Sequence, residues 1–187
     1  SPFESLIPAG EPDPTVAEGA ADMVWSIPNL HVDVHEASSP VPVQWWRSVG
    51  HSHTGFVVNG VLDELAQLGG RDPLQLRREL LAGKPRHLAV LNAAARRARW
   101  GQPLEPGHHL GIALHESFGS IVAQVAEVSV EGRSVRVHRV TCAIDCGFVV
   151  NPAGVIAQME SAVVFGLSAA LYGEIGIERG GAVHSNF

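Results

Sequence analysis

Apolar residues recur at helical spacing in three stretches of the first half of the chain. The first stretch covers about residues 54–68, the second begins at Asp72-Pro73 and ends near Leu81, and the third covers about residues 87–100. Because residues three or four positions apart share one face of an α-helix, these stretches predict three amphipathic helices. The apolar face of the first helix is formed by Val57, Val61, Leu65 and Leu68. The inward face of the third is formed by Leu88, Leu91, Ala95 and Ala98.

In the second half of the chain the apolar period changes from helical to alternating. Apolar and polar residues alternate over 121–128, the turn Glu131-Gly132-Arg133 follows, and alternation resumes at Val135. This pattern predicts a β-hairpin. A second hairpin, packed on the same sheet, is predicted over residues 173–187 with its turn at Gly180-Gly181.

The most apolar segment lies between the two predicted hairpins. Asn151-Pro152 provides a cap and a first-turn proline for a helix that continues to about Tyr172. Residues 162–171 are almost uniformly apolar around the helix, so we expect this helix to be buried. Gln158 and Glu160, near its start, then need polar partners.

The chain is predicted to be an α+β protein in two parts. The first 42 residues contain seven prolines and no sustained period, so this segment is expected to be extended and irregular, with a short strand over about 43–49. The Pro- and Gly-rich stretch 101–107 is the best internal boundary. Residues 1–101 therefore form an extended segment and a helical layer, and residues 102–187 form hairpins packed on the buried helix.

Composition and charge exclude several classes of protein. The chain has 187 residues, of which 45% are hydrophobic, which is typical of a globular domain rather than a disordered one. No uninterrupted apolar run reaches the eighteen or more residues that a membrane helix needs, so no membrane-spanning segment is expected. Residues 71–99 hold eight of the thirteen basic residues and two acids, which leaves a formal charge of −12 on the remainder.

The basic stretch allows two interpretations. It is either a surface for a phosphate-bearing cofactor or an acidic partner subunit, or a set of solvated helix faces. Trp100 is the one aromatic residue that accompanies it, whereas a single-strand binder needs several stacking platforms. Nucleic-acid binding is therefore not expected.

Cysteines and histidines do not define a metal site. Cys142 and Cys146 lie four positions apart, which spans about 13 Å in a strand, whereas a disulfide needs Cα atoms within about 7 Å. Both are expected to be buried, inert thiols. His51 and His53 have ligand-like spacing, but a third ligand, such as His115 or Glu116, is placed by no motif.

A serine hydrolase is a competing interpretation. The sequence Gly50-His51-Ser52-His53-Thr54-Gly55 comes within one residue of the Gly-x-Ser-x-Gly nucleophile elbow. Ser52 would then be the nucleophile, but the second Gly arrives one position late, and the sequence assigns no downstream Asp and His to a triad.

The strand end before the last helix carries a longer motif. Residues 142–152 read Cys-Ala-Ile-Asp-Cys-Gly-Phe-Val-Val-Asn-Pro, and Gln158-Met159-Glu160-Ser161 follows. This block resembles the xanthine oxidase family of molybdenum hydroxylases, in which an Asp-x-Gly strand end, an Asn-Pro pair and a Gln-x-Glu-Gly helix approach the molybdopterin. Ser161 replaces the usual Gly after the Glu.

A second set of segments is similar to the same family, and together they cover about residues 25–187. The segments are Trp25-Ser26-Ile27-Pro28-Asn29, Trp46-Arg47-Ser48-Val49-Gly50 and Asp63-Glu64-Leu65-Ala66. The wording of residues 46–53 and of 111–119 is most similar to the branch that includes the isoquinoline 1-oxidoreductase β-subunit and membrane-bound aldehyde dehydrogenase.

The resemblance implies a function and a site. It implies the molybdopterin-binding portion of an oxidoreductase that hydroxylates aldehydes or N-heteroaromatic rings with water-derived oxygen. The implied cofactor-binding residues are Arg47, Ser48, Gly50, His51 and Gln158. Arg47 also has a structural interpretation as part of a buried ion pair, and Asp145, in the Asp-x-Gly strand end, as a turn residue that bonds local backbone.

The resemblance also implies cofactors and partners. The cofactor is expected to be molybdopterin in its cytosine dinucleotide form with molybdenum, and 2Fe-2S clusters are expected on a small partner subunit. The other implied partners are the remaining segments of the large subunit and a cytochrome c as electron acceptor. The family's catalytic glutamate is expected beyond Phe187, and its Gly-Gln-Gly cofactor loop has no place between Leu81 and His108. The chain alone is therefore expected to be inactive, and a non-catalytic structural or assembly module is the alternative.

Overall fold

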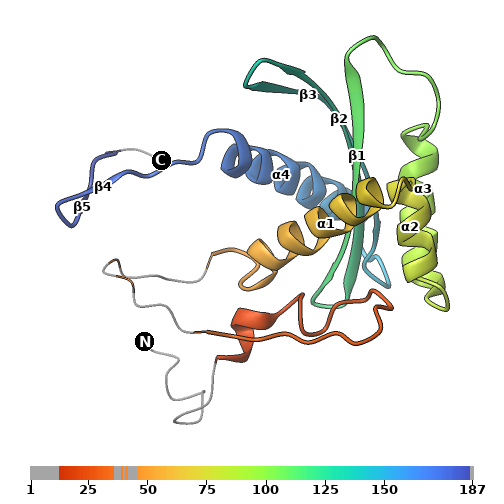
Figure 1. The fold of residues 1–187 in the computed structure, drawn as a ribbon, viewed down its shortest axis with the longest axis horizontal. Helices are drawn as coiled ribbons and strands as arrows, with labels where there is room; N and C mark the ends of the chain where they lie inside the picture. The colour runs from red at the N-terminus through yellow and green to blue at the C-terminus, as the bar shows by residue number, and fades with distance from the viewer. Residues whose placement is uncertain (1–12, 36–38, 40, 42–45, 186–187) are drawn as a thin grey trace.

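The computed structural model describes residues 13–35, 39, 41 and 46–185. Its centre is an antiparallel sheet in the order β1-β2-β3, formed by His108–Ser117, Ser120–Glu131 and Ser134–Asp145. Helices α1 (His51–Leu68), α2 (Pro73–Leu80) and α3 (Pro85–Arg97) gather on the sheet, and α4 (Pro152–Leu171) extends away from it alongside α1 (Figure 1). This arrangement confirms the predicted α+β class.

The three predicted helices are all present, and local signals define where they begin. The Asp72 carboxylate accepts a hydrogen bond from the Gln75 backbone N–H at 2.8 Å, and Pro73 occupies the first turn of α2. The inward face predicted for α3 is also confirmed. Its residues Leu91, Ala95 and Ala98 are buried in the core, and Leu88 packs against that core.

One hydrophobic core joins the helices to the sheet. Its members come from Trp25, α1, α2, α3, β1 and β2, and the largest buried apolar side chains are Leu62, Leu81, Leu91, Leu114, Ile121 and Val125. α3 lies over β2 and β3, and the buried residues of β2 alternate along the strand at Ile121, Ala123 and Val125. Burial of each such side chain stabilises the fold by about 1.5–3 kcal/mol.

The face that α1 turns to the core differs from the prediction. The buried residues of α1 are Thr54, Asn59, Leu62 and Ala66, whereas the predicted apolar face of Val57, Val61, Leu65 and Leu68 is between 47% and 85% exposed. Asn59 accounts for the difference. Its side-chain amide donates to Leu114 O at 3.0 Å and accepts from Leu114 N–H at 3.1 Å, and these bonds hold the face of α1 that contains Asn59 against β1.

A buried arginine continues this network into α2. Arg77 has no exposed surface, and its guanidinium donates to Asp63 Oδ1 at 2.6 Å and to Asn59 O at 3.0 Å. A buried cation needs such partners because its desolvation is costly. Arg77 therefore fixes α2 against α1.

The first predicted hairpin is confirmed, and β1 extends it. β2 and β3 are joined by a two-residue turn at Gly132-Arg133, with Gly132 at φ 61° and Glu131 paired with Ser134. β1 joins β2 through Phe118 and Gly119, both at positive φ, which suits the right-handed twist of a two-residue hairpin turn.

The burial predicted for α4 is wrong. Asn151 caps this helix as expected, accepting from the backbone N–H of Ala153 at 3.1 Å, but none of its residues is buried. Its apolar residues are mostly exposed, except for a partly buried stripe formed by Val155, Met159, Val163 and Leu167, and α4 contacts the rest of the chain at β3, Trp46 and Arg47.

α4 bears on the expectation that the chain has no membrane-spanning segment. By length and composition α4 is apolar enough to cross a membrane, because Gln158 and Glu160 interrupt the apolar run without outweighing it. The same criteria are met by core helices of soluble proteins, so they do not place α4 in a membrane.

Two other predicted strands differ from the structure. The second hairpin is present as β4 (Ile177–Glu178) and β5 (Gly181–Ala182), but these form a separate sheet with exposed residues rather than packing on the first sheet. Of the strand predicted over 43–49, residues 43–45 lie outside the described residues, and 47–49 form a turn. The chain also has a short 3-10 helix, η2 (Pro14–Ala17), beside the start of α1.

An ion pair holds the end of β3 against the first turn of α3. The Arg86 guanidinium donates to both Asp145 carboxylate oxygens at 2.9 Å, and Asp145 also accepts from Gly147 N–H at 3.0 Å. The predicted local turn bond of Asp145 is therefore confirmed, and the arginine is an addition. The Arg86 hydrogen bonds, followed by the Gly147 bond, lower the pKa of Asp145 to about 2.

We predict that Asn59→Ala lowers the free energy of unfolding by about 2–4 kcal/mol. The substitution leaves the Leu114 N–H and C=O groups buried without partners, which costs about 1–3 kcal/mol per group. Urea denaturation measures the loss. Gln67→Ala, on the exposed side of the same helix, is the control and is expected to change stability by less than about 0.5 kcal/mol. Equal effects of the two substitutions would contradict the anchoring role of Asn59.

We also predict that the effect of Arg86→Gln depends on pH. The pKa of Asp145 is lower in the folded chain than its ordinary value of 3.8, so the ion pair stabilises the fold above about pH 4. This stabilisation is lost as the pH falls toward about 2. The difference in urea midpoint between Arg86→Gln and the unmodified chain should therefore shrink between pH 6 and pH 2.5. A difference that is constant with pH, as expected for the exposed control Arg133→Gln, would refute the pairing.

Candidate functional site

A groove lies between the start of α1 and the second half of α4. Its volume is about 670 Å³, and Figure 1 shows the two helices side by side along it. The lining residues are Trp46, Arg47, Ser48, Ser52 and Phe56 on one side and Ser161, Ala162, Phe165, Gly166, Ala169 and Ala170 on the other. The small residues of α4 leave this space open, and the aromatic side chains make its walls apolar.

Two residues that are far apart in the sequence meet beside this groove. Arg47 Nη2 donates to Gln158 Oε1 at 3.2 Å, although the residues are 111 positions apart. Next to them the rings of Trp46 and Phe165 lie 5.4 Å apart. The Arg47 loop and α4 are thus joined by one polar and one aromatic contact, both largely exposed.

The Arg47 loop has an unusual backbone conformation. Ser48 and Val49 both have positive φ, at 82° and 51°, a region that β-branched residues such as valine rarely adopt. Ser52 Oγ donates to Arg47 O at 3.1 Å and lies 2.9 Å from Ser48 Oγ, and the Ser48 hydroxyl also bonds to Arg47 O. Strained loops of this kind cluster at functional sites, where the surrounding contacts hold them in place.

Gly50 and His51 lie next in the chain but face elsewhere. A Cβ at Gly50 would come within 2.0 Å of Thr15 O, so only glycine permits the close approach of η2 to this loop. His51 Nδ1 lies 2.8 Å from His115 Nε2 on β1. Neither residue lines the groove.

The histidine pair is partly removed from solvent. Burial, and secondly the neighbouring His51, lower the pKa of His115. His53 Nε2 instead lies 3.3 Å from Val16 O. Among the described residues no three His, Cys, Asp or Glu side chains are grouped as metal ligands.

Ser52 has no geometry for nucleophilic catalysis. Its hydroxyl bonds to Ser48 Oγ and Arg47 O, and no imidazole in the described part of the chain lies within hydrogen-bond distance of it. A serine nucleophile needs a base in that position. The serine hydrolase interpretation therefore has no support from the structure.

The two cysteines are unpaired thiols, as predicted, but are half-buried rather than buried. Burial raises the pKa of Cys142, which disfavours its reactive thiolate form.

The sequence alone points to Arg47, Ser48 and Gln158, but not to Phe56 and Phe165, which form apolar walls of the groove. No local pattern marks these roles, because each depends on which helix faces which. The run of small residues in α4, such as Gly166, Ala169 and Ala170, was the one signal of an open space beside that helix.

The chain is similar to a molybdopterin-binding domain family and to three oxidoreductases. Residues 100–187 match the family model of the molybdopterin cofactor-binding domain. The beta subunit of isoquinoline 1-oxidoreductase from Brevundimonas diminuta is 31% identical over 170 residues, which cover 88% of this chain and 22% of that protein. No solved structure matches the chain.

Two further relatives support the same assignment. A nicotinate dehydrogenase subunit of Pseudomonas putida is 28% identical over 81% of this chain and 14% of that protein. Membrane-bound aldehyde dehydrogenase (pyrroloquinoline-quinone) of Gluconacetobacter polyoxogenes is 31% identical over 76% of this chain and 21% of that protein. The chain thus spans less than a quarter of the length of these relatives. Residues 100–187 match the molybdopterin cofactor-binding domain family, and this match together with the three relatives confirms the resemblance to molybdenum hydroxylase large subunits.

Proposed function

We propose that this chain forms one wall of the molybdopterin site in an oxidoreductase that hydroxylates aldehydes or N-heteroaromatic rings with water-derived oxygen. The observation that carries the proposal is the Arg47–Gln158 contact, which joins the two family motifs beside a groove. The names of the relatives supply the substrate classes, since they refer to isoquinoline, nicotinate and aldehydes.

The donor set of the groove fits the proposed cofactor. Arg47 donates one N–H to Gln158 and has further N–H donors available, and the Gln158 amide nitrogen provides two additional N–H donors. A pterin ring presents both donors and acceptors, and a phosphate group suits the planar fork of a guanidinium. Arg47, Ser48 and Gln158 would hold these groups, and the bound cofactor would supply the redox chemistry.

The other residues of the proposed site hold the cofactor-binding residues in position and take no part in the reaction. The Trp46 and Phe165 rings, one from each side of the groove, provide apolar surfaces beside its polar groups. Gly50 and His51 remain part of the proposed site, and their contacts with Thr15 and His115 fix the direction of the loop. No carboxylate lines the groove among the described residues, so we place the general base of the reaction on another segment of the enzyme.

The proposal extends to the rest of the enzyme. The cofactor is proposed to be the cytosine dinucleotide form, with 2Fe-2S clusters on a companion small subunit and a cytochrome c as electron acceptor. The remaining segments of the large subunit are proposed to cover the exposed apolar faces of α1 and α4, because large contiguous exposed apolar patches mark interaction surfaces.

A structural or assembly module is the alternative function. The observation that favours it is the same lack of a carboxylate in the groove, within the described part of the chain. In that case the Arg47–Gln158 contact would join two elements of the fold and bind nothing.

We predict that Arg47→Lys weakens cofactor retention by about 10- to 100-fold in the complete enzyme. Lysine keeps the charge but loses the planar fork, and charge-assisted hydrogen bonds contribute about 1.5–3 kcal/mol. Molybdenum content after dialysis measures the loss. Arg133→Lys, in the β2–β3 turn, is the matched control and should retain molybdenum. If Arg47→Lys retains it equally well, Arg47 is not a cofactor ligand.

We predict that Gln158→Ala lowers molybdenum content or turnover and leaves the fold intact. Gln158 is exposed in this chain, so its removal should change the urea midpoint little. Circular dichroism reports whether the fold is intact, metal analysis measures molybdenum content, and turnover is measured with an artificial electron acceptor. Wild-type occupancy together with wild-type kinetics would remove Gln158 from the site and favour the structural module.

A further inference from the structure

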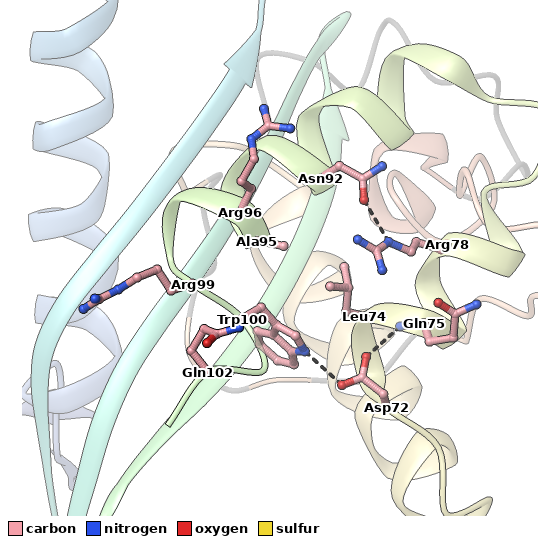
Figure 2. Close-up of a pocket in the computed structure, with 10 residues that line it drawn as sticks. All are labelled: Asp72, Leu74, Gln75, Arg78, Asn92, Ala95, Arg96, Arg99, Trp100 and Gln102. Carbon is pink, nitrogen blue, oxygen red and sulfur yellow. Dashed lines mark hydrogen bonds between the residues drawn. The ribbon is translucent and has the colours of Figure 1, made fainter. Parts of the chain in front are cut away.

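Two open grooves adjoin along α3, on a part of the chain that the proposed cofactor site does not use. The first lies between α2 and α3 and has a volume of about 1130 Å³ (Figure 2). The second, of about 950 Å³, lies between α3 and β3. Both grooves are lined by Arg96 and Arg99, so these two side chains form their common border.

Arginines dominate both grooves. Arg78 adds a guanidinium to the first groove, and Arg97 and Arg139 add two to the second. In Figure 2 Arg78 lies across the first groove beside Asn92, whereas Arg99 points away toward the strands. The positive charge therefore extends along α3 from one groove into the next.

Most of this charge has no counter-charge in the described part of the chain. Arg139 pairs with Glu127 at 2.8 Å, but Arg78, Arg96, Arg97 and Arg99 have no ion pair among the described residues. Arg78 is held by a neutral group, donating to Asn92 Oδ1 at 2.8 Å.

The one acid that lines the two grooves, among the residues described, is already engaged. Asp72 accepts from Trp100 Nε1 at 2.9 Å and from Gln75 N–H at 2.8 Å. Its carboxylate fixes the indole and caps α2. Four guanidiniums within one surface repel one another, and an anionic partner would convert this repulsion into attraction.

The shape of the surface favours an extended partner over a compact anion. A single phosphate or carboxylate would reach the arginines of one groove, whereas the charge extends over two. The first groove also has an apolar floor, with buried Leu74 and Ala95 and half-buried Trp100, which suits apolar side chains between the acids of a polypeptide. A nucleic acid is less suited, because the one aromatic ring is fixed by Asp72 and offers no series of stacking platforms.

We propose that the two grooves together bind a carboxylate-rich polypeptide segment of a companion subunit. Planar guanidiniums suit carboxylates because they form two parallel hydrogen bonds. The companion subunit rests on the proposed function, since two of the relatives are named as subunits of their enzymes. The grooves themselves do not depend on it.

The first test measures binding to the full chain without any cofactor. The probe is a fluorescein-labelled peptide of glutamates with interspersed leucines, followed by fluorescence anisotropy at low salt. We expect the double variant Arg96→Gln/Arg99→Gln to weaken binding by at least about tenfold, because each side chain borders both grooves. Affinity should also fall as salt rises.

The control removes the same charge from the far end of the sheet. Arg133→Gln/Arg136→Gln changes two exposed arginines that line neither groove and should alter binding by less than about twofold. Equal losses in both double variants would show that the peptide responds to net charge alone and would overturn the proposal. Tighter binding of inorganic pyrophosphate or of a single-stranded oligonucleotide would also overturn it, in favour of a phosphate ligand.

The second test uses the native complex, purified through a tag on the subunit that contains this chain. Arg96→Gln/Arg99→Gln should lower the amount of companion subunit that co-purifies at a salt concentration of about 0.3 M, while molybdenum content stays normal. Normal subunit retention would overturn the docking proposal and leave the cofactor proposal standing. Loss of molybdenum with normal retention would place these arginines at the cofactor and overturn the docking proposal as well.

Discussion

The amide of Asn59 is the constraint on which the arrangement of the helices depends. β1 is an edge strand, and the backbone groups of Leu114 on its free side would otherwise lie buried without partners. The Asn59 side chain satisfies both of them, and its backbone carbonyl accepts from Arg77, so one residue links β1, α1 and α2. α1 begins directly after the Arg47 loop, and Ser52 and Phe56 near its start line one wall of the groove.

Local signals in the sequence predicted the elements better than their faces. The caps at Asp72 and Asn151, the turn at Gly132 and the helical spacing of residues 87–100 depend on neighbouring residues, and all of them are present. The inward face of α1 was not predictable in this way. The apolar stripe and Asn59 lie on different faces of α1, and only one of these faces can pack against β1. Asn59 faces the strand because leaving the buried backbone groups of Leu114 unpaired would cost more free energy than leaving the stripe exposed within this chain.

The candidate site shows a similar division. Arg47 and Gln158 were named through family motifs, whereas the bond between them joins positions too far apart for any periodic pattern. The left-handed conformations of Ser48 and Val49 had no sequence signal either, because serine and valine are poor markers of positive φ. The hydrophobicity of α4 is evident in the sequence and indicates a surface to be covered, but it does not indicate which polypeptide covers it.

The place of α4 in the chain has a consequence for synthesis. Every residue of the hydrophobic core precedes Pro152, and so does Ala143, which packs against it. Because chains emerge from the ribosome amino terminus first, the sheet and its three helices can close before the apolar helix is complete. The nascent protein then carries an exposed apolar helix on a domain that has already folded. Association of this helix with the rest of the enzyme therefore competes with its aggregation with other nascent chains.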